Sequence, residues 1–82
     1  MQINIVKVHG ILWSGEADSV TVPAVEGELT VLPHHVPLVT ALNHGRLVVK
    51  KDSKEIFTHD VDGGVLEVSK KYQKELKEAL QG

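Results

Sequence analysis

Residues 46–59, RLVVKKDSKEIFTH, decide the fold. Two runs that contain β-branched or aromatic residues flank a polar tip at Lys51, Asp52 and Ser53. Such runs, separated by a few turn-forming residues, are typical of a β-hairpin. The stretch therefore predicts two antiparallel strands joined by a tight turn.

The sequence on both sides of this hairpin also alternates β-branched runs with turn signals. These signals recur about every 8 to 12 residues, which is typical of a sandwich or barrel. The further runs predicted as strands are INIVKV (3–8), ILW (11–13), SVTV (19–22), LTVL (29–32) and VDGGVLEV (61–68). The paired glycines in the last run permit a tight turn or a bulge.

The run at 19–22 has the clearest strand period. Its two valines alternate with a serine and a threonine, so one face is apolar and the other polar. Proline cannot donate a ladder hydrogen bond, so we expect Pro23 to end this strand. A polar loop, AVEGE (24–28), is expected to follow.

The predicted core is aliphatic, because Trp13, Phe57 and Tyr72 are the only aromatic residues. A chain of 82 residues buries only about 60% of its unfolded surface, which fits one small domain. We expect an all-β, antiparallel β-sandwich over residues 1–69. The expected core residues are Val20, Val22, Leu29, Val31, Leu47, Val49, Phe57, Leu66 and Val68.

The last stretch, residues 70–82, changes character. Tyr72, Leu76 and Leu80 recur at four-residue spacing, which indicates one apolar helical stripe. A single helix this short is marginal unless its stripe packs against something. We therefore expect a short helical or frayed tail.

Composition excludes several classes of protein. The net charge of −2 and the mixed signs give no basic face for nucleic acid. There is no cysteine, so disulfides and thiolate metal sites are excluded. No apolar run approaches the roughly 18 residues of a membrane span, and the N-terminus does not resemble a signal peptide. We expect a soluble, intracellular protein.

The histidines do not predict a metal site. Zinc needs three or four converging ligands, and no HxH or HxxxH spacing is present. His34 and His35 are adjacent, so in an extended backbone they point to opposite faces. We interpret them as solvated or interface side chains, and we expect no metal.

Catalytic motifs are also absent from the sequence. There is no GxSxG, GxGxxG or P-loop, so neither a nucleophile elbow nor a phosphate cradle is indicated. Glu26, Glu28 and Glu67 could supply a carboxylate pair, but solvated acidic residues are far commoner. Lys51 lies at a hairpin tip, as in lipoyl or biotinyl carrier domains, yet VVKKDSKEI lacks the residues that flank their modified lysine. We expect a non-catalytic protein without a cofactor.

Four stretches together resemble a known family. LWSGEADSVTVPAVEGE (12–28), VEGELTVLPHHVPLVTAL (25–42), GRLVVKK (45–51) and DGGVLEV (62–68) closely resemble the N-terminal β-sandwich of the epsilon subunit of F-type ATP synthases. The resemblance spans about residues 3 to 68, in order and with similar spacing.

The chain departs from the family pattern at several positions. Two family glycines are replaced by Thr30 and His34, and the usual Ser-Gly-Gly begins with Asp62. The family continues after Leu-Glu-Val with a closing strand and two helices, whereas here residues 70–82 follow. We therefore expect no nucleotide binding and no helix-mediated inhibition, and we expect the sheet edge left without its closing strand to invite pairing with another copy.

The resemblance implies a role in the rotor. Members of this family join the gamma subunit to the ring of membrane c subunits, so that proton or sodium flow is coupled to ATP synthesis. The resemblance assigns the ring contact to Glu26, Gly27 and Glu28. It assigns the gamma contact to His35, Val36, Pro37 and Leu38.

The implied location is peripheral, on the cytoplasmic side of the bacterial inner membrane or its organellar equivalent. The membrane would be contacted only through the ring. A second interpretation stays open, in which the chain is a free-standing all-β binding or carrier module that shares only the sandwich.

Overall fold

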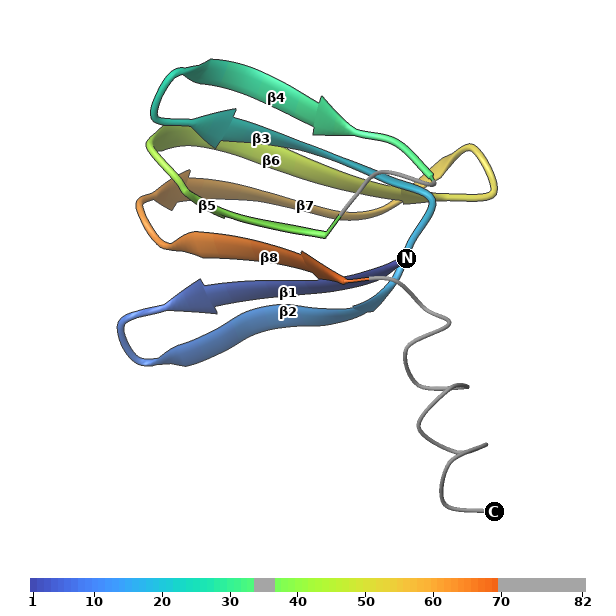
Figure 1. Ribbon diagram of the computed structural model, residues 1–82, viewed down its shortest axis with the longest axis horizontal. Helices are drawn as coiled ribbons and strands as arrows, with labels where there is room; N and C mark the ends of the chain where they lie inside the picture. The colour runs from blue at the N-terminus through green and yellow to red at the C-terminus, as the bar shows by residue number, and fades with distance from the viewer. Residues whose placement is uncertain (34–36, 70–82) are drawn as a thin grey trace.

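Two four-stranded antiparallel sheets pack face to face in the computed structural model, which describes residues 1–33 and 37–69 (Figure 1). One sheet has the strand order β2-β1-β8-β5 and the other has the order β4-β3-β6-β7. The predicted antiparallel β-sandwich is confirmed. The predicted helical tail at 70–82 lies outside the described residues.

The described strands are short, and most are joined by tight turns. Their bounds are β1 (Gln2–Lys7), β2 (Gly10–Glu16), β3 (Ser19–Ala24), β4 (Gly27–Val31), β5 (Leu38–Ala41), β6 (His44–Lys51), β7 (Lys54–Asp62) and β8 (Val65–Ser69).

The hairpin predicted at 46–59 is formed by β6 and β7. Lys51 pairs with Lys54, so the turn itself consists of Asp52 and Ser53 alone. Both turn residues have positive φ, at 54° and 63°, as a type I′ turn requires. The pairing shifts by one residue between Val49 and Lys50, which marks a bulge in this hairpin.

The core contains side chains from both sheets. The largest fully buried side chains are Ile3, Ile5, Leu47, Leu66, Val20, Val22, Val31 and Val49. Seven of the nine expected core residues are buried. Leu29 and Phe57 were expected there too, but they are only partly buried and pack against the core from its margin. Both belong to edge strands, where neighbours cover a side chain from one side only.

The expectation that Pro23 ends its strand is wrong. β3 continues to Ala24, and Pro23 pairs with Glu28 of β4. The β3–β6 pairing covers only residues 19 to 21, so no ladder bond on that side needs an N–H from Pro23. The predicted loop at 24–28 is therefore shorter, since only Val25 and Glu26 separate β3 from β4.

The VLEV segment (65–68) belongs to β8, which is a central strand of its sheet and not an edge strand. β8 pairs with β1 on one side and with β5 on the other. The first and last described strands thus lie side by side, and this pairing ties the beginning of the sandwich to its end (Figure 1).

Candidate interaction site

The acidic turn, defined here as residues 25–28, joins β3 to β4. Ala24 pairs with Gly27, which leaves Val25 and Glu26 as the two turn residues. Gly27 has a φ of +124°, and a Cβ there would meet nothing within 4 Å, so glycine is favoured by the backbone conformation and not by crowding. Glu26 and Glu28 are both exposed. Their exposure agrees with the interpretation of these glutamates as solvated acidic residues.

The base of the acidic turn is held by backbone contacts. The amide of Asn43 donates to the carbonyl oxygen of Pro23 at 2.6 Å, and the amide of Leu42 donates to that of Gly64 at 2.9 Å. These bonds connect the β5–β6 link with β3 and with the β7–β8 turn. Figure 1 shows these turns gathered at one end of the sandwich, so the acidic turn and its two exposed glutamates belong to that end.

The segment assigned to gamma by resemblance is described only in part. His35 and Val36 lie outside the described residues, as does His34. Pro37 is exposed, directly before β5. Leu38 pairs with Val68 and is partly buried against the core, so its side chain serves packing within the sandwich.

The acidic turn and the described part of the other assigned set, Pro37 and Leu38, lie toward opposite ends of the sandwich. The acidic turn lies at the end that also holds the β1–β2 and β7–β8 turns, whereas β5, which directly follows Pro37, begins toward the end with the β6–β7 hairpin (Figure 1). Strands β3 to β6 run between the two ends. The structure therefore does not bring the two sets together.

An exposed apolar row crosses the outer face of the β2-β1-β8-β5 sheet, and sequence reasoning missed it. Ile11 pairs with Val6, Val6 with Val65, and Val65 with Ala41. Ile11 is 66% exposed, and Val39 on β5, directed to the same face, is 68% exposed. The register shift between Ile5 and Val6 brings Ile11 opposite Val6, and the rest of the row depends on strand pairing that the sequence pattern does not give.

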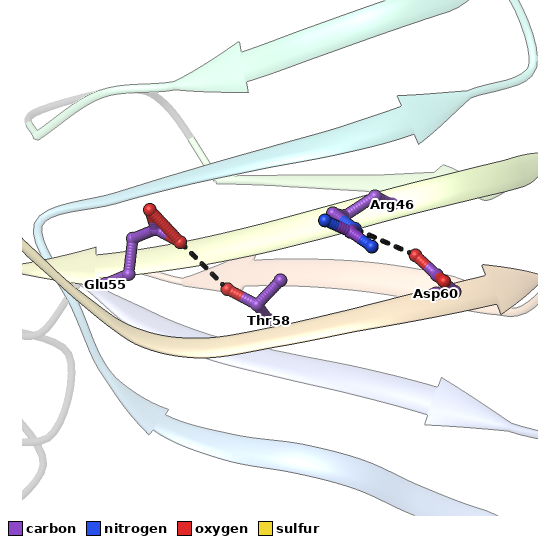
Figure 2. Close-up of polar contacts among 4 residues, drawn as sticks. All are labelled: Arg46, Glu55, Thr58 and Asp60. Atoms are coloured by element: carbon purple, nitrogen blue, oxygen red, sulfur yellow. Dashed lines mark hydrogen bonds and ion pairs between the residues drawn. The ribbon is translucent and has the colours of Figure 1, made fainter.

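The outer face of the other sheet is polar. Figure 2 shows Arg46 of β6 beside Asp60 of β7, with Nε donating to Oδ1 at 2.9 Å. The hydrogen bond from Arg46, and then its positive charge, lower the pKa of Asp60 below its usual value. On the same strand, Thr58 Oγ1 donates to Glu55 Oε1 at 3.1 Å (Figure 2). The two outer faces of the sandwich thus differ in chemical character.

The described ranges 1–33 and 37–69 contain neither a metal-binding cluster nor a membrane-spanning helix. Within them, no three histidine, aspartate or glutamate side chains gather closely enough to hold a metal ion. In that same part of the chain, no helix has the length and apolar character needed to cross a membrane. Lys51, the lysine compared above with that of carrier domains, is the last residue of β6 and pairs with Lys54 across the hairpin.

The architecture is that of a small β-sandwich domain with exposed turns at both ends. The family model described as ATP synthase, Delta/Epsilon chain, beta-sandwich domain matches residues 1–73. The chain belongs to this family.

Several curated relatives are each named ATP synthase epsilon chain. The one from Dehalococcoides mccartyi is 43% identical over 68 residues, which is 83% of this chain and 48% of the relative. The one from Chromobacterium violaceum is 42% identical over 69 residues, 83% of this chain and 49% of the relative. The one from Sulfurimonas denitrificans is 37% identical over 71 residues, 87% and 55% of the two chains. The chain spans about half the length of these relatives.

Proposed function

We propose that the chain is a non-catalytic subunit of the central stalk of an F-type ATP synthase, where it links the gamma subunit to the c-ring. In this role it transmits rotation, so that ion flow through the ring is coupled to ATP synthesis. It is a peripheral subunit on the cytoplasmic side of the membrane, and it contacts the membrane only through the ring.

The observation that carries this proposal is the separation between the acidic turn and the start of β5, the two regions to which the resemblance assigns the contacts. A linker between two bodies needs two surfaces that can be occupied at once. The acidic turn and the Pro37 end lie at opposite ends of one domain whose strands run from one to the other (Figure 1). Membership of the ATP synthase delta/epsilon family supports the assignment of the two partners.

The ring contact is assigned to Glu26, Gly27 and Glu28. Two exposed carboxylates on one turn give a local negative potential that suits basic and amide groups on a partner's loops. An exposed ion pair contributes only about 0.2–1 kcal/mol. The glutamates therefore orient and accelerate docking, and other contacts at the same end supply most of the affinity.

The gamma contact is assigned to residues 35–38 and extends onto β5. Leu38 is turned partly inward, so the exposed Val39 next to it is the better anchor for a partner. Val39 borders the apolar row that continues through Val65 and Val6. Exposed apolar patches of this kind mark protein interaction surfaces.

The alternative, a free-standing carrier module, has weaker support. A carrier would present one modified lysine on a hairpin tip, but Lys51 is paired with a second lysine, Lys54, across the turn. The turn residues themselves are Asp52 and Ser53.

Co-purification tests the proposal. The tagged 82-residue chain is expressed with the gamma subunit and the c subunits of the same organism, and bound partners are identified by mass spectrometry. We expect gamma and the c-ring in the bound fraction. Recovery of neither, with a lipoyl or biotinyl group found on Lys51, would replace the rotor assignment with the carrier.

A further inference from the structure

The two asparagines of this chain, Asn4 and Asn43, are held in opposite ways. Asn43 is exposed and lies outside the strands, directly before the start of β6. The backbone amide of His44, the next residue, donates to Asn43 Oδ1 at 2.8 Å. Since the donor is a backbone N–H, its partner must be the carboxamide oxygen, which defines the orientation of this side chain. The carboxamide of Asn43 is therefore folded back onto the nitrogen that follows it in the chain.

This contact brings the carboxamide carbon of Asn43 close to a nucleophile. Cγ is separated from Oδ1 by one C=O bond of about 1.23 Å, so it lies at most about 4 Å from the His44 nitrogen. Reacting atoms in a near-attack arrangement are about 3–3.5 Å apart. A small rotation about the side-chain bonds of Asn43 closes this gap, and no core neighbour opposes the rotation because Asn43 is exposed.

The backbone on both sides of the side chain is fixed. The amide of Asn43 donates to the carbonyl oxygen of Pro23 at 2.6 Å, and the amide of Leu42 donates to that of Gly64 at 2.9 Å. His44 is exposed and is unbranched at Cβ, so its side chain does not crowd its own backbone nitrogen. These contacts keep the carboxamide and the nitrogen adjacent, which lowers the entropy lost when the two groups react.

Asn4 is the natural comparison within the same chain. It lies in the middle of β1, where it pairs with Ser14 on one side and with Glu67 on the other. Its Nδ2 donates to Glu67 Oε1 at 3.1 Å, and its Oδ1 accepts from Ser14 Oγ. The next residue, Ile5, is β-branched and fully buried, so its backbone nitrogen is crowded. The structure therefore holds the Asn4 carboxamide away from the nitrogen that follows it.

We propose that Asn43 is a site of spontaneous deamidation, with the His44 backbone nitrogen as nucleophile and water as the only other reactant. In the first step a bond forms between this nitrogen and Cγ, and the Cγ–Nδ2 bond breaks. The proton of the backbone nitrogen is transferred to the leaving amine, so ammonia is released and a cyclic imide remains. Water then opens the imide at one of its two carbonyl carbons, which leaves aspartate or isoaspartate at position 43. Neither an oxidant nor a reductant is consumed.

The modification changes the end of the sandwich that bears the acidic turn. A carboxylate replaces a neutral amide beside Pro23, whose pairing partner on β4 is Glu28. The reaction thus adds a negative charge to the end that already presents Glu26 and Glu28. The isoaspartate product also lengthens the backbone between β5 and β6. The reaction depends on local geometry alone and is independent of the role proposed in the rotor.

Peptide mapping by mass spectrometry tests the effect of the geometry. One sample of the 82-residue chain is kept folded at physiological temperature and pH, and a second is kept unfolded in urea. The conversion of amide to carboxyl is followed at Asn43 and Asn4 in both samples. We expect folding to slow the reaction of Asn4 at least about tenfold and to leave Asn43 reacting at least as fast as in urea. A lower rate at Asn43 in the folded chain than in urea would refute the proposal.

The products identify the nucleophile. Attack by the backbone nitrogen gives an imide, and opening of the imide gives both isoaspartate and aspartate. Direct hydrolysis of the side-chain amide by water gives aspartate alone. Labelling of the aged, folded chain with an isoaspartyl methyltransferase distinguishes the two routes, and the variant Asn43→Asp gives the background without the asparagine. We expect isoaspartate at position 43 in the wild type, and its absence from the deamidated chain would refute attack by the His44 nitrogen.

A substitution at the nucleophile completes the test. His44→Val adds a branched Cβ beside the attacking nitrogen, and it should slow deamidation of Asn43 about tenfold with an unchanged circular dichroism spectrum. His9→Val is the matched control, because it makes the same change at another exposed position, in the β1–β2 turn, that follows neither asparagine. We expect this control to deamidate at the wild-type rate. Equal rates for the two variants would show that the His44 nitrogen is not the nucleophile.

Discussion

A Cβ atom on Gly64 would lie 2.7 Å from the carbonyl oxygen of Val6, closer than such atoms approach in proteins. Gly64 also has a φ of +118°, so two independent constraints act at this position. The contact packs the β7–β8 turn onto β1 at the end of the sandwich that bears the acidic turn. Glycine at 64 is therefore required for the assembly of that end surface.

Gly64→Ala and Gly27→Ala form a matched pair for this claim. Both residues have positive φ, so alanine at either site carries backbone strain of about 1–3 kcal/mol. Only Gly64 adds a steric overlap, since a Cβ at Gly27 has open space. We expect urea denaturation to show that Gly64→Ala lowers the free energy of unfolding by about 1–3 kcal/mol more than Gly27→Ala. Equal losses would mean that the Gly64–Val6 contact is not restrictive.

The Arg46–Asp60 pair predicts a pH effect of known sign. The pKa of Asp60 is lowered, first by the hydrogen bond from Arg46 and then by its charge. A lowered carboxyl pKa contributes stability above the ordinary aspartate range, and this contribution is lost as the pH falls through the folded-state pKa. Both side chains are mostly exposed, so the effect on stability is small.

An NMR titration of the Asp60 carboxyl carbon measures this effect. We expect Arg46→Met to raise the pKa of Asp60 toward that of an ordinary aspartate and to leave the melting temperature at neutral pH nearly unchanged. An unaltered pKa in the variant would show that the pair is not formed in solution.

Substitutions at Leu38 and Val39 distinguish an effect on folding from an effect on docking. Leu38 packs partly against the core, so Leu38→Ala should reduce the free energy of unfolding, at or below the lower end of about 2–5 kcal/mol. Val39 is 68% exposed, so Val39→Asn should change stability by no more than about 0.5 kcal/mol. If gamma docks on β5, Val39→Asn should weaken gamma binding roughly tenfold, as measured by calorimetry.

Val25→Asn is the control for this experiment, because Val25 is a similarly exposed valine at the opposite end of the sandwich. Its affinity for gamma should match that of the wild type. If Val25→Asn weakened gamma binding and Val39→Asn did not, gamma would bind at the end of the acidic turn, which would contradict the proposed assignment.

The sequence predicted the strands well wherever alternation was regular. SVTV (19–22) and VLEV (65–68) place their core side chains as expected, because the period of a strand needs no knowledge of its neighbours. Pro23 was misjudged, since its tolerance depends on how far β6 pairs along β3. That extent is a property of the assembled sheet.

The candidate site was predictable only where one turn carries it. Glu26 and Glu28 are adjacent in sequence and stay exposed together. The apolar row from Ile11 to Ala41 combines the consecutive strands β1 and β2 with β8 and β5, which are distant from them in sequence, and a register shift after Ile5 brings Ile11 opposite Val6. Neither the strand order nor that shift is encoded in a local pattern.

The acidic turn should act mainly on the rate of ring docking. We expect Glu26→Lys to slow association with the c-ring roughly tenfold at low salt, and the double variant Glu26→Lys/Glu28→Lys to slow it further. The effect should shrink at higher salt, because the Debye length falls from about 30 Å at 0.01 M to about 8 Å at 0.15 M. Glu55→Lys makes the same change in charge on β7 and should leave the rate unchanged. A rate insensitive to the double reversal at low salt would remove the acidic turn from the ring contact.

The most direct test of the account is whether one copy of the chain binds gamma and the c-ring at the same time. The chain is first saturated with gamma, and its binding to immobilised, detergent-solubilised c-ring is then measured by surface plasmon resonance. We predict that the gamma-bound chain binds the ring at least as tightly as the free chain, and that gamma and the chain are retained together in equal amounts. Loss of ring binding on saturation with gamma would show that the two partners compete for one surface, which would contradict a linker with contacts at opposite ends.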